Sequence, residues 1–234
     1  MATHDYSEPT PNTDAGPDKP ASAKSNGNLL VPVTARGEAT RRRILDAAEA
    51  VFGELGYYEA SISEITRRAG VAQGTFYIYF HSKREVFAEL VEDLGKRLRA
   101  AIRTATAGIT DRLEMERCGF TAFFEFVSTH RRIYRIVQEA ERVAPEAAHA
   151  YYHGISSGYI RGLQSAMEAG TIRSENPEAI AYALMGISHF VALRWIVWPQ
   201  EGEEQEGFTP RLPDEIFASV MDFIFHGLAK PENE

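Results

Sequence analysis

Several side chains with hydrogen-bonding groups lie close together near position 75. They are Gln73, Thr75, Tyr77 and Tyr79. The amide of Gln73 can donate to and accept from the edge of an adenine at once. Thr75 and Tyr77 can donate their hydroxyls to phosphates or contact a thymine methyl. Tyr79, and Lys83 shortly after it, are suited to clamping a phosphate. This set of groups is typical of a surface that contacts nucleic acid.

The same segment is predicted to be a short helix. At helical spacing Phe76 and Phe80 lie on one side, which leaves the polar groups on the other side. The preceding helix opens with SISE (61–64), a capping box in which the Ser61 hydroxyl and the Glu64 carboxylate accept from free backbone N–H groups. Gly70 ends that helix, and the next begins after two residues. Two short helices joined by such a turn form a helix-turn-helix.

A longer helix is expected on each side of this motif. Before it, an apolar stripe runs from 44 to 55, three arginines (41–43) lie in the first turns, and Gly56 ends the helix. After it, a second capping box, SKRE (82–85), opens a helix whose apolar stripe runs from 87 to 102. About 20 residues at 1.5 Å each make that helix roughly 30 Å long, enough to connect two domains.

The stretch from Thr40 to Phe87 closely resembles the DNA-binding domain of TetR-family transcriptional regulators. It reads TRRRILDAAEAVFGELGYYEASISEITRRAGVAQGTFYIYFHSKREVF, and its most specific part is AGVAQGTFYIYFHSK (69–83). Ala72 stands where a capping Ser is common in the family, and Thr66 stands where Ala is usual. Because an N-cap side chain contributes roughly 1 kcal/mol, Ala72 implies a slightly weaker start for the third helix.

The resemblance implies a fold, a partner and a set of contact residues. The third helix would enter the major groove, and a homodimer would bind a palindromic double-stranded operator whose half-sites lie one or more helical turns apart. The implied DNA contacts are Thr40, Arg41, Ser61, Gln73, Gly74, Thr75, Tyr77, Tyr79 and Lys83. We predict an all-α protein of about nine helices: a three-helix N-terminal helix-turn-helix DNA-binding domain and a six-helix C-terminal effector-binding and dimerisation domain.

Helix signals continue to the end of the chain. Helix starts are predicted at Asp111, Pro145, Asn176–Pro177 and Pro213, and helix ends at Gly170 and Pro199. The expected domains are a disordered, proline-rich tail (1–35), the DNA-binding domain (36–83) and the ligand-binding and dimerisation domain (84–234). The resemblance implies that the last two helices, 177–198 and 213–229, form the dimer. Exposed apolar surface without a dimer is the alternative.

The resemblance also implies an effector cavity between the middle helices. The candidate lining residues are Phe123, Phe124, Phe126, Tyr152, Tyr159 and Phe190, with Gln138, His189 and Arg194 as polar groups that orient a ligand. Aromatic residues at helical spacing also form ordinary core, so that interpretation stays open for each of them. Such a cavity suits a small hydrophobic or aromatic effector, for example a fatty acyl compound. We expect its binding to favour one arrangement of the helix 83–104 and to release the operator.

The charge of the chain is unevenly distributed. A formal net charge of −8 argues, taken alone, against a nucleic-acid partner. By segment, however, the charge is −2 for 1–35, +1 for 36–83 and −7 for 84–234. The acidity therefore belongs mainly to the C-terminal domain. DNA binding must depend on matched contacts made by two copies of a small basic domain.

Other functions have less support in the sequence. His149 and His153 could ligate zinc from one helix face, but Ala150 replaces the glutamate of the HExxH metalloprotease motif. We expect no enzyme activity, no metal and no cofactor. A ligand-independent DNA-binding protein and a transcriptional activator are the alternatives to a ligand-released repressor. With one cysteine, no signal-peptide pattern and no run of about 18 apolar residues, we expect a cytoplasmic protein with no membrane partner.

Overall fold

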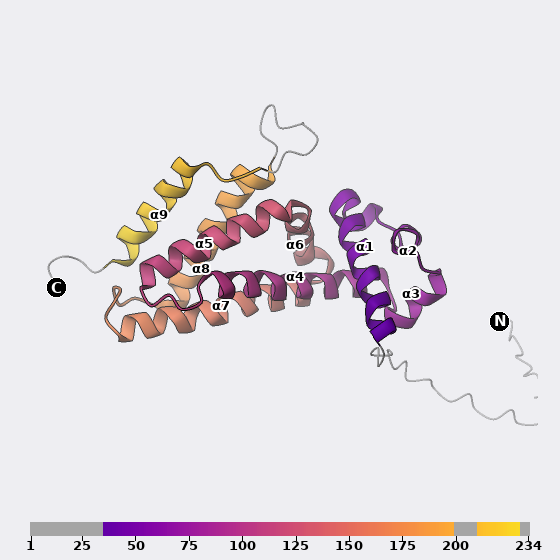
Figure 1. The fold of residues 1–234 in the computed structure, drawn as a ribbon, viewed down its shortest axis with the longest axis horizontal. Helices are drawn as coiled ribbons and strands as arrows, with labels where there is room; N and C mark the ends of the chain where they lie inside the picture. The colour runs from indigo at the N-terminus through magenta and orange to yellow at the C-terminus, as the bar shows by residue number, and fades with distance from the viewer. Residues whose placement is uncertain (1–34, 199–209, 230–234) are drawn as a thin grey trace, which may run out of the picture.

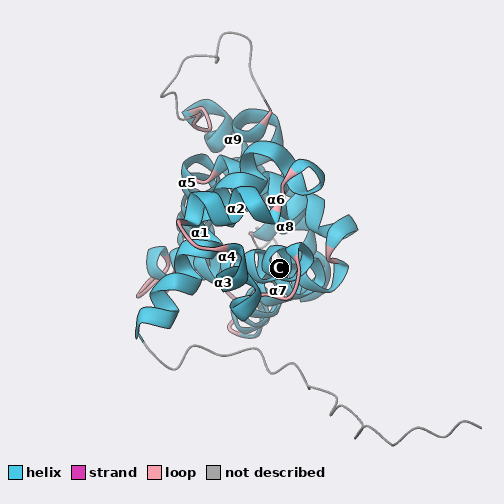
Figure 2. Ribbon diagram, turned by 90° about the vertical axis from the view of Figure 1, so that its right-hand side faces the viewer, coloured by secondary structure: helices cyan, strands magenta, loops and turns pink. Residues whose placement is uncertain are grey.

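The computed structural model describes residues 35–198 and 210–229, and these residues form helices and no strands (Figure 1, Figure 2). The helices are α1 (Ala35–Glu59), α2 (Ile62–Ala69), α3 (Gln73–Tyr79), α4 (Lys83–Ala105), α5 (Arg112–Thr129), α6 (Arg131–Val143), α7 (Pro145–Glu168), α8 (Pro177–Ala192), a π-helical turn η1 (Leu193–Val197) and α9 (Asp214–Leu228). The predicted all-α fold of about nine helices is confirmed. The predicted tail lies outside the described residues, except for Ala35, which begins α1.

Helices α1 to α3, which are predicted to bind DNA and are here called the DNA-binding head, follow the predicted boundaries closely. Gly70 ends α2 with a left-handed conformation (φ 63°). Gly56 also has positive φ (76°), a conformation that suits glycine, and it kinks α1 instead of ending it. The helix predicted to end at Gly56 therefore continues through Tyr57 to Glu59.

The two predicted capping boxes form only in part. The Ser61 and Ser82 hydroxyls each accept from the backbone N–H three residues later, both at 3.1 Å. The Glu64 carboxylate instead accepts from Arg67 and Arg68, since two guanidinium groups lie within its reach. On α4 the Glu85 carboxylate accepts from the backbone N–H of His81, one residue before the expected position.

Buried residues form two hydrophobic clusters. The first joins α1 to α4 with α6 and the start of α7, and it includes Phe52, Phe87 and Ile136. The second joins α5, the end of α7, α8, η1 and α9. The predicted boundary between residues 83 and 84 therefore cuts through one continuous core. Packing of the DNA-binding head is coupled directly to α6 and α7.

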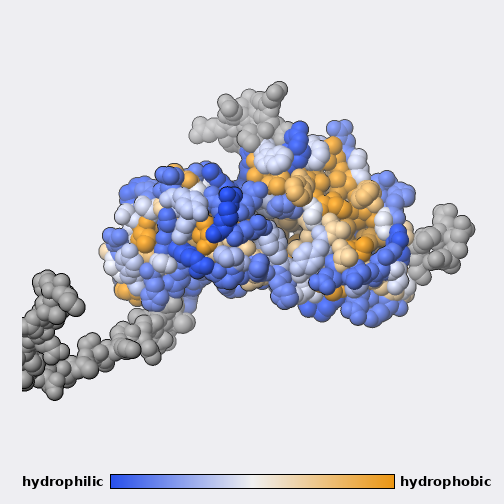
Figure 3. Space-filling view, turned by 180° about the vertical axis from the view of Figure 1, so that it is seen from behind, coloured by the Kyte–Doolittle hydropathy of each residue, from blue (hydrophilic) through white to orange (hydrophobic). Residues whose placement is uncertain are grey.

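Helices α8 and α9 carry much exposed apolar surface. The exposed large apolar residues are Tyr182 and Phe190 of α8 and Phe223 of α9, together with Trp198 just after η1. Apolar residues gather on the half of the molecule away from the DNA-binding head (Figure 3). By length and mean hydropathy (1.6) the segment Pro177–Val197 could also cross a membrane. Glu178 and Arg194 interrupt its apolar run. The absence of a membrane partner stays a prediction.

Candidate DNA-binding surface and effector cavity

Helix α3 presents three of its predicted contact residues on its outer side. Phe76 and Phe80 are fully buried, whereas Gln73 and Gly74 are exposed and Tyr77 is 48% exposed. Ile78, which the sequence analysis did not single out, is 47% exposed on the same short helix. Ala72, at the N-cap position, forms no side-chain hydrogen bond, because its methyl group has no acceptor. The amide of Gln73 and the phenol of Tyr77 are therefore available to a DNA groove.

The other residues predicted to contact DNA are more constrained. Thr75 and Tyr79 are half-buried, and the Thr40 hydroxyl donates to the carbonyl of Arg36 (3.0 Å). Arg41 forms an ion pair with Glu89 of α4, and its guanidinium carbon lies 5.5 Å from the ring centre of Phe80. Ser61 caps α2. Their DNA contacts stay predictions.

The ammonium group of Lys83 is hydrogen-bonded to backbone carbonyls of the protein. Its ammonium group donates to the carbonyls of Tyr57 (2.8 Å), Tyr58 (3.3 Å) and Ala60 (2.8 Å), and lies 4.4 Å from the ring centre of Tyr57. An ammonium has three N–H groups, so these carbonyls engage all of them. In this arrangement Lys83 fixes the end of α1 to the start of α4. It would have to release a carbonyl to clamp a phosphate.

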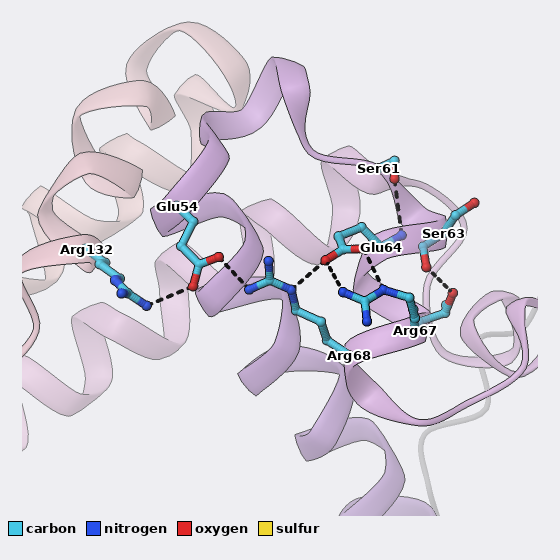
Figure 4. Close-up of polar contacts among 8 residues, drawn as sticks. Glu54, Ser61, Ser63, Glu64, Arg67, Arg68 and Arg132 are labelled. Atoms are coloured by element: carbon cyan, nitrogen blue, oxygen red, sulfur yellow. Dashed lines mark hydrogen bonds and ion pairs between the residues drawn. The ribbon is translucent and has the colours of Figure 1, made fainter.

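A chain of ion pairs connects α6 to α2 across the head (Figure 4). Arg132 of α6 pairs with Glu54 of α1 (2.9 Å), which also pairs with Arg68 of α2 (2.6 Å). Glu64 then pairs with Arg68 and Arg67, both at 2.7 Å, and they lower its pKa to about 2. Exposed pairs of this kind stabilise little individually. They hold both arginines near carboxylates of the head itself.

Helix α6 also contacts the kink of α1. One Glu139 carboxylate oxygen accepts from the backbone N–H of Tyr57 at 2.7 Å. A methyl group at Gly56 would lie 2.8 Å from the other oxygen, and one at Gly53 would lie 2.5 Å from Cβ of Arg132. The two glycines therefore allow α6 to approach α1 closely.

The C-terminal part contains a half-open cavity of about 590 Å³. Residues of α4, α5, α6, α7 and α8 form its wall. Its volume lies within the range of roughly 300–1,000 Å³ that is usual for small-molecule sites. This is the position at which the sequence analysis expected an effector.

Four of the nine predicted ligand residues line this cavity: Phe123, Tyr152, Tyr159 and His189. The other five are not part of its wall: Phe124, Phe126, Gln138, Phe190 and Arg194. Phe124 packs edge-on against Phe217 of α9, Phe126 stacks on His130, and Phe190 is 66% exposed. All of these aromatic residues lie on helices with apolar stripes. Only tertiary packing therefore decides which of them line the cavity and which do not. The ligand contacts themselves stay predictions.

One end of the cavity holds polar residues that the sequence analysis missed. The buried Arg112 and Glu116 of α5 form an ion pair, and the Tyr159 hydroxyl donates to Glu116. Burial raises the pKa of Glu116, while Arg112 and Tyr159 oppose that shift. Burial and the nearby Glu116 raise the pKa of Tyr159. The four-residue spacing of the Arg112–Glu116 pair was the one available signal in the sequence.

The other end of the cavity is aromatic and uncharged. The hydroxyl oxygen of Tyr134 lies 2.6 Å from Nδ1 of His189. Burial lowers the pKa of His189 and raises that of Tyr134. Both groups are therefore neutral near pH 7. Tyr134 and Val137 place α6 in the wall at this end.

His149 and His153, considered above as zinc ligands, are both exposed on α7. Within the described ranges no three histidine, cysteine, aspartate or glutamate side chains come together in a way that could hold a metal ion.

Comparisons with known proteins identify the family. Residues 44–90 match the model of bacterial regulatory proteins of the tetR family. Over 193 residues the chain is 30% identical to the HTH-type transcriptional regulator EthR of Mycobacterium tuberculosis, covering 81% of this chain and 85% of EthR. The chain belongs to the TetR family. It is therefore a transcriptional regulator with a helix-turn-helix DNA-binding domain, as the resemblance implied.

Two further transcriptional regulators are similar to this chain. The HTH-type transcriptional activator FasR of Mycolicibacterium smegmatis is 32% identical over 134 residues, which cover 57% of this chain and only 59% of FasR. The structure of FadR from Bacillus subtilis, in complex with stearoyl-CoA, aligns with a TM-score of 0.66 at 18% identity, covering 80% of this chain and 98% of FadR. At that identity the likeness to FadR shows the shared fold.

Proposed function

We propose that this protein is a ligand-responsive repressor that binds a palindromic operator as a homodimer in the cytoplasm and is released by a small hydrophobic effector. The observation that carries the proposal is the cavity of about 590 Å³ in a chain that also presents Gln73 and Tyr77 outward. A fatty acyl compound is one candidate effector, since the FadR structure of similar fold contains stearoyl-CoA.

The exposed apolar surface of α8 and α9 supports the homodimer. Phe190 and Phe223 are 66% and 70% exposed, and a large exposed apolar patch usually marks an interaction site. A two-fold partner packed against these helices would bury them. It would also place two copies of α3 for two half-sites of one operator.

Helix α6 supports a route from the cavity to the DNA-binding head. Tyr134 and Val137 line the cavity, whereas Arg132 and Glu139 contact α1. A ligand that favours one position of α6 and α4 would shift the balance between two arrangements of the head. It acts only through its different affinities for those two arrangements.

Selection of bound fragments from random or genomic DNA tests the first half of the proposal. We expect one palindromic sequence protected in a footprint, with half-sites spaced by whole helical turns. Weak binding to all sequences, with steep salt dependence, would instead favour the ligand-independent alternative.

A transcriptional activator is the second candidate, and the relative FasR favours it because it is named as an activator. Transcription in vitro from a promoter that carries the selected palindrome separates the two. A repressor lowers transcript yield when added, whereas an activator raises it.

A further inference from the structure

The wall of the effector cavity carries a strong positive charge. Four arginines line it: Arg99 and Arg103 of α4, Arg112 of α5 and Arg161 of α7. The wall contains one carboxylate, Glu116, so its formal charge is +3. The whole chain has a net charge of −8. A positive cavity inside an acidic protein would attract an anion and repel a cation.

These arginines are spread along the part of α7 that lines the cavity, with Arg99 beside Gly154, Arg161 beside Gly158 and Arg112 beside Gly162. They belong to the last half of α4, the first turn of α5 and the last half of α7, which run side by side (Figure 1). The aromatic end lies toward the head, where Tyr134 and His189 meet. There burial lowers the pKa of His189 and raises that of Tyr152, so both side chains are neutral near pH 7. The charge of the wall therefore comes from the arginines and Glu116.

Most of the positive charge in the wall is not neutralised. Arg99, Arg103 and Arg161 form no ion pair with any residue in the described ranges, whereas Arg112 pairs with Glu116. The side chain of Arg112 is 9% exposed, and its Nε is the single buried side-chain nitrogen or oxygen without a hydrogen-bond partner in the described part of the chain. A buried N–H without an acceptor is unfavourable, so this end of the cavity is short of acceptor oxygens.

Glycines of α7 make room for two of the guanidinium groups. Gly154, Gly158 and Gly162 line the cavity at four-residue spacing, on one face of the helix. A methyl group at Gly154 would lie 2.6 Å from Nη1 of Arg99, and one at Gly162 would lie 2.7 Å from Nη1 of Arg112. Larger residues at these positions would displace the arginines. The sequence thus provides both the charges and the space that they occupy.

We propose that the effector is an amphipathic anion. Its apolar body lies against the aromatic end near Phe123 and Tyr134, and its acidic oxygen group, a carboxylate or a phosphate, is bound by Arg99, Arg161 and their neighbours. This inference rests on the proposed effector function of the cavity and narrows its ligand class. Charge-assisted hydrogen bonds from guanidinium groups to such oxygens are short, strong and geometrically specific.

Four probes with the same twelve-carbon chain test the head-group preference: dodecanoate, dodecyl phosphate, dodecanol and dodecylammonium. Each is titrated calorimetrically into the full chain below its micelle-forming concentration. We expect at least one of the two anions to bind at least about tenfold more tightly than dodecanol, and dodecylammonium to bind most weakly. Which anion binds more tightly distinguishes a carboxylate effector from a phosphate effector. Equal binding of anion and alcohol, or no binding of either anion, overturns the proposal.

Substitutions in the wall locate the anion. Arg99→Gln and Arg161→Gln, on different helices, are each expected to weaken anion binding about tenfold and to leave dodecanol binding unchanged. Arg117→Gln is the control, because Arg117 is exposed on α5 and pairs with Glu114 outside the cavity. Thermal melting without probe checks that each variant is folded. Anion binding that is unaffected in both wall variants overturns the assignment.

Gel shifts with the selected operator separate this inference from the proposed function. Release of DNA by dodecanol as readily as by dodecanoate would leave the proposed effector function intact and would refute the anion preference. Tight, arginine-dependent anion binding with no release of DNA would support the anion site and refute the proposed release.

Discussion

Replacing Lys83 by methionine distinguishes a structural role of this residue from a purely DNA-contacting role. Methionine keeps much of the length and removes the charge. The substitution leaves the carbonyls of Tyr57, Tyr58 and Ala60 without their shared donor. If Lys83 served only to clamp a phosphate, the fold would not be affected by its loss.

The expected loss of stability follows from the burial of the three contacts. The contacts with Tyr57 and Ala60, both 2.8 Å, are part-buried, while that with Tyr58 is longer and exposed, so water can replace it. We assign about 1 kcal/mol to each part-buried contact and up to about 1 kcal/mol to the ammonium over the Tyr57 ring. Lys83→Met should therefore lower the free energy of unfolding by about 2–3 kcal/mol.

Thermal melting at fixed protein concentration measures this effect. At about 2–4 °C per kcal/mol for a chain of this size, the melting temperature should fall by about 4–12 °C. Lys96→Met is the matched control, because Lys96 is exposed on the same helix and its loss should change stability by less than about 0.5 kcal/mol. Equal melting temperatures for the two variants would refute the structural role. Weaker operator binding with normal stability would restore the phosphate contact as the main role of Lys83.

Four further outcomes are expected. Gln73→Ala or Tyr77→Ala should abolish operator binding in a gel shift while circular dichroism stays unchanged, since each lost base contact costs about 1–3 kcal/mol in each of two copies; wild-type affinity would contradict this. Glu139→Ala should lower the free energy of unfolding by about 1–3 kcal/mol in urea titrations because the N–H of Tyr57 loses its acceptor, whereas the exposed Glu125→Ala should not. Arg67 and Arg68 lower the pKa of Glu64 from its ordinary 4.5 to about 2, so the contribution of Glu64 to stability is present above pH 4.5 and is lost as the pH falls toward 2. The melting temperature of the Glu64→Gln variant should therefore depend less on pH between about 2 and 4.5. The same pH profile in the variant and the wild type would speak against the ion pairs. Phe223→Glu should convert a dimer to a monomer in light scattering, and Ile78→Glu, an exposed apolar residue on α3, should leave the dimer intact; a dimer in both would place the interface elsewhere.

Local signals in the sequence predicted the helices well. The starts at Ser61, Asp111 and Asn176 each place a side-chain oxygen where it accepts from a backbone N–H two or three residues later, and all three bonds are present. Such caps depend on a few neighbouring residues, so they can be recognised without tertiary information. The prediction that the helix ends at Gly56 was wrong. A residue distant in the sequence, Glu139, accepts a hydrogen bond from the backbone N–H of the residue that follows the kink.

The arginines that line the cavity could not be predicted in the same way. Arg99, Arg112 and Arg161 come from three helices, and each alone looks like an ordinary charged residue on a helix. Only the packing of α4, α5 and α7 brings them to one surface. The glycines at 154, 158 and 162 were a recognisable sign of close packing on α7, but they do not reveal what occupies the space.

Helix α6 gives the proposed coupling a consequence that can be measured at both sites. Its residues Tyr134 and Val137 line the cavity, and its Glu139 accepts from the backbone N–H at the kink of α1. If the effector and the operator favour different positions of this helix, each must weaken the binding of the other by the same factor. Loss of the Glu139 contact would then reduce that factor in both directions. A variant could change how strongly the effector weakens operator binding and leave unchanged how strongly the operator weakens effector binding. Such a result would be incompatible with a single equilibrium of α6.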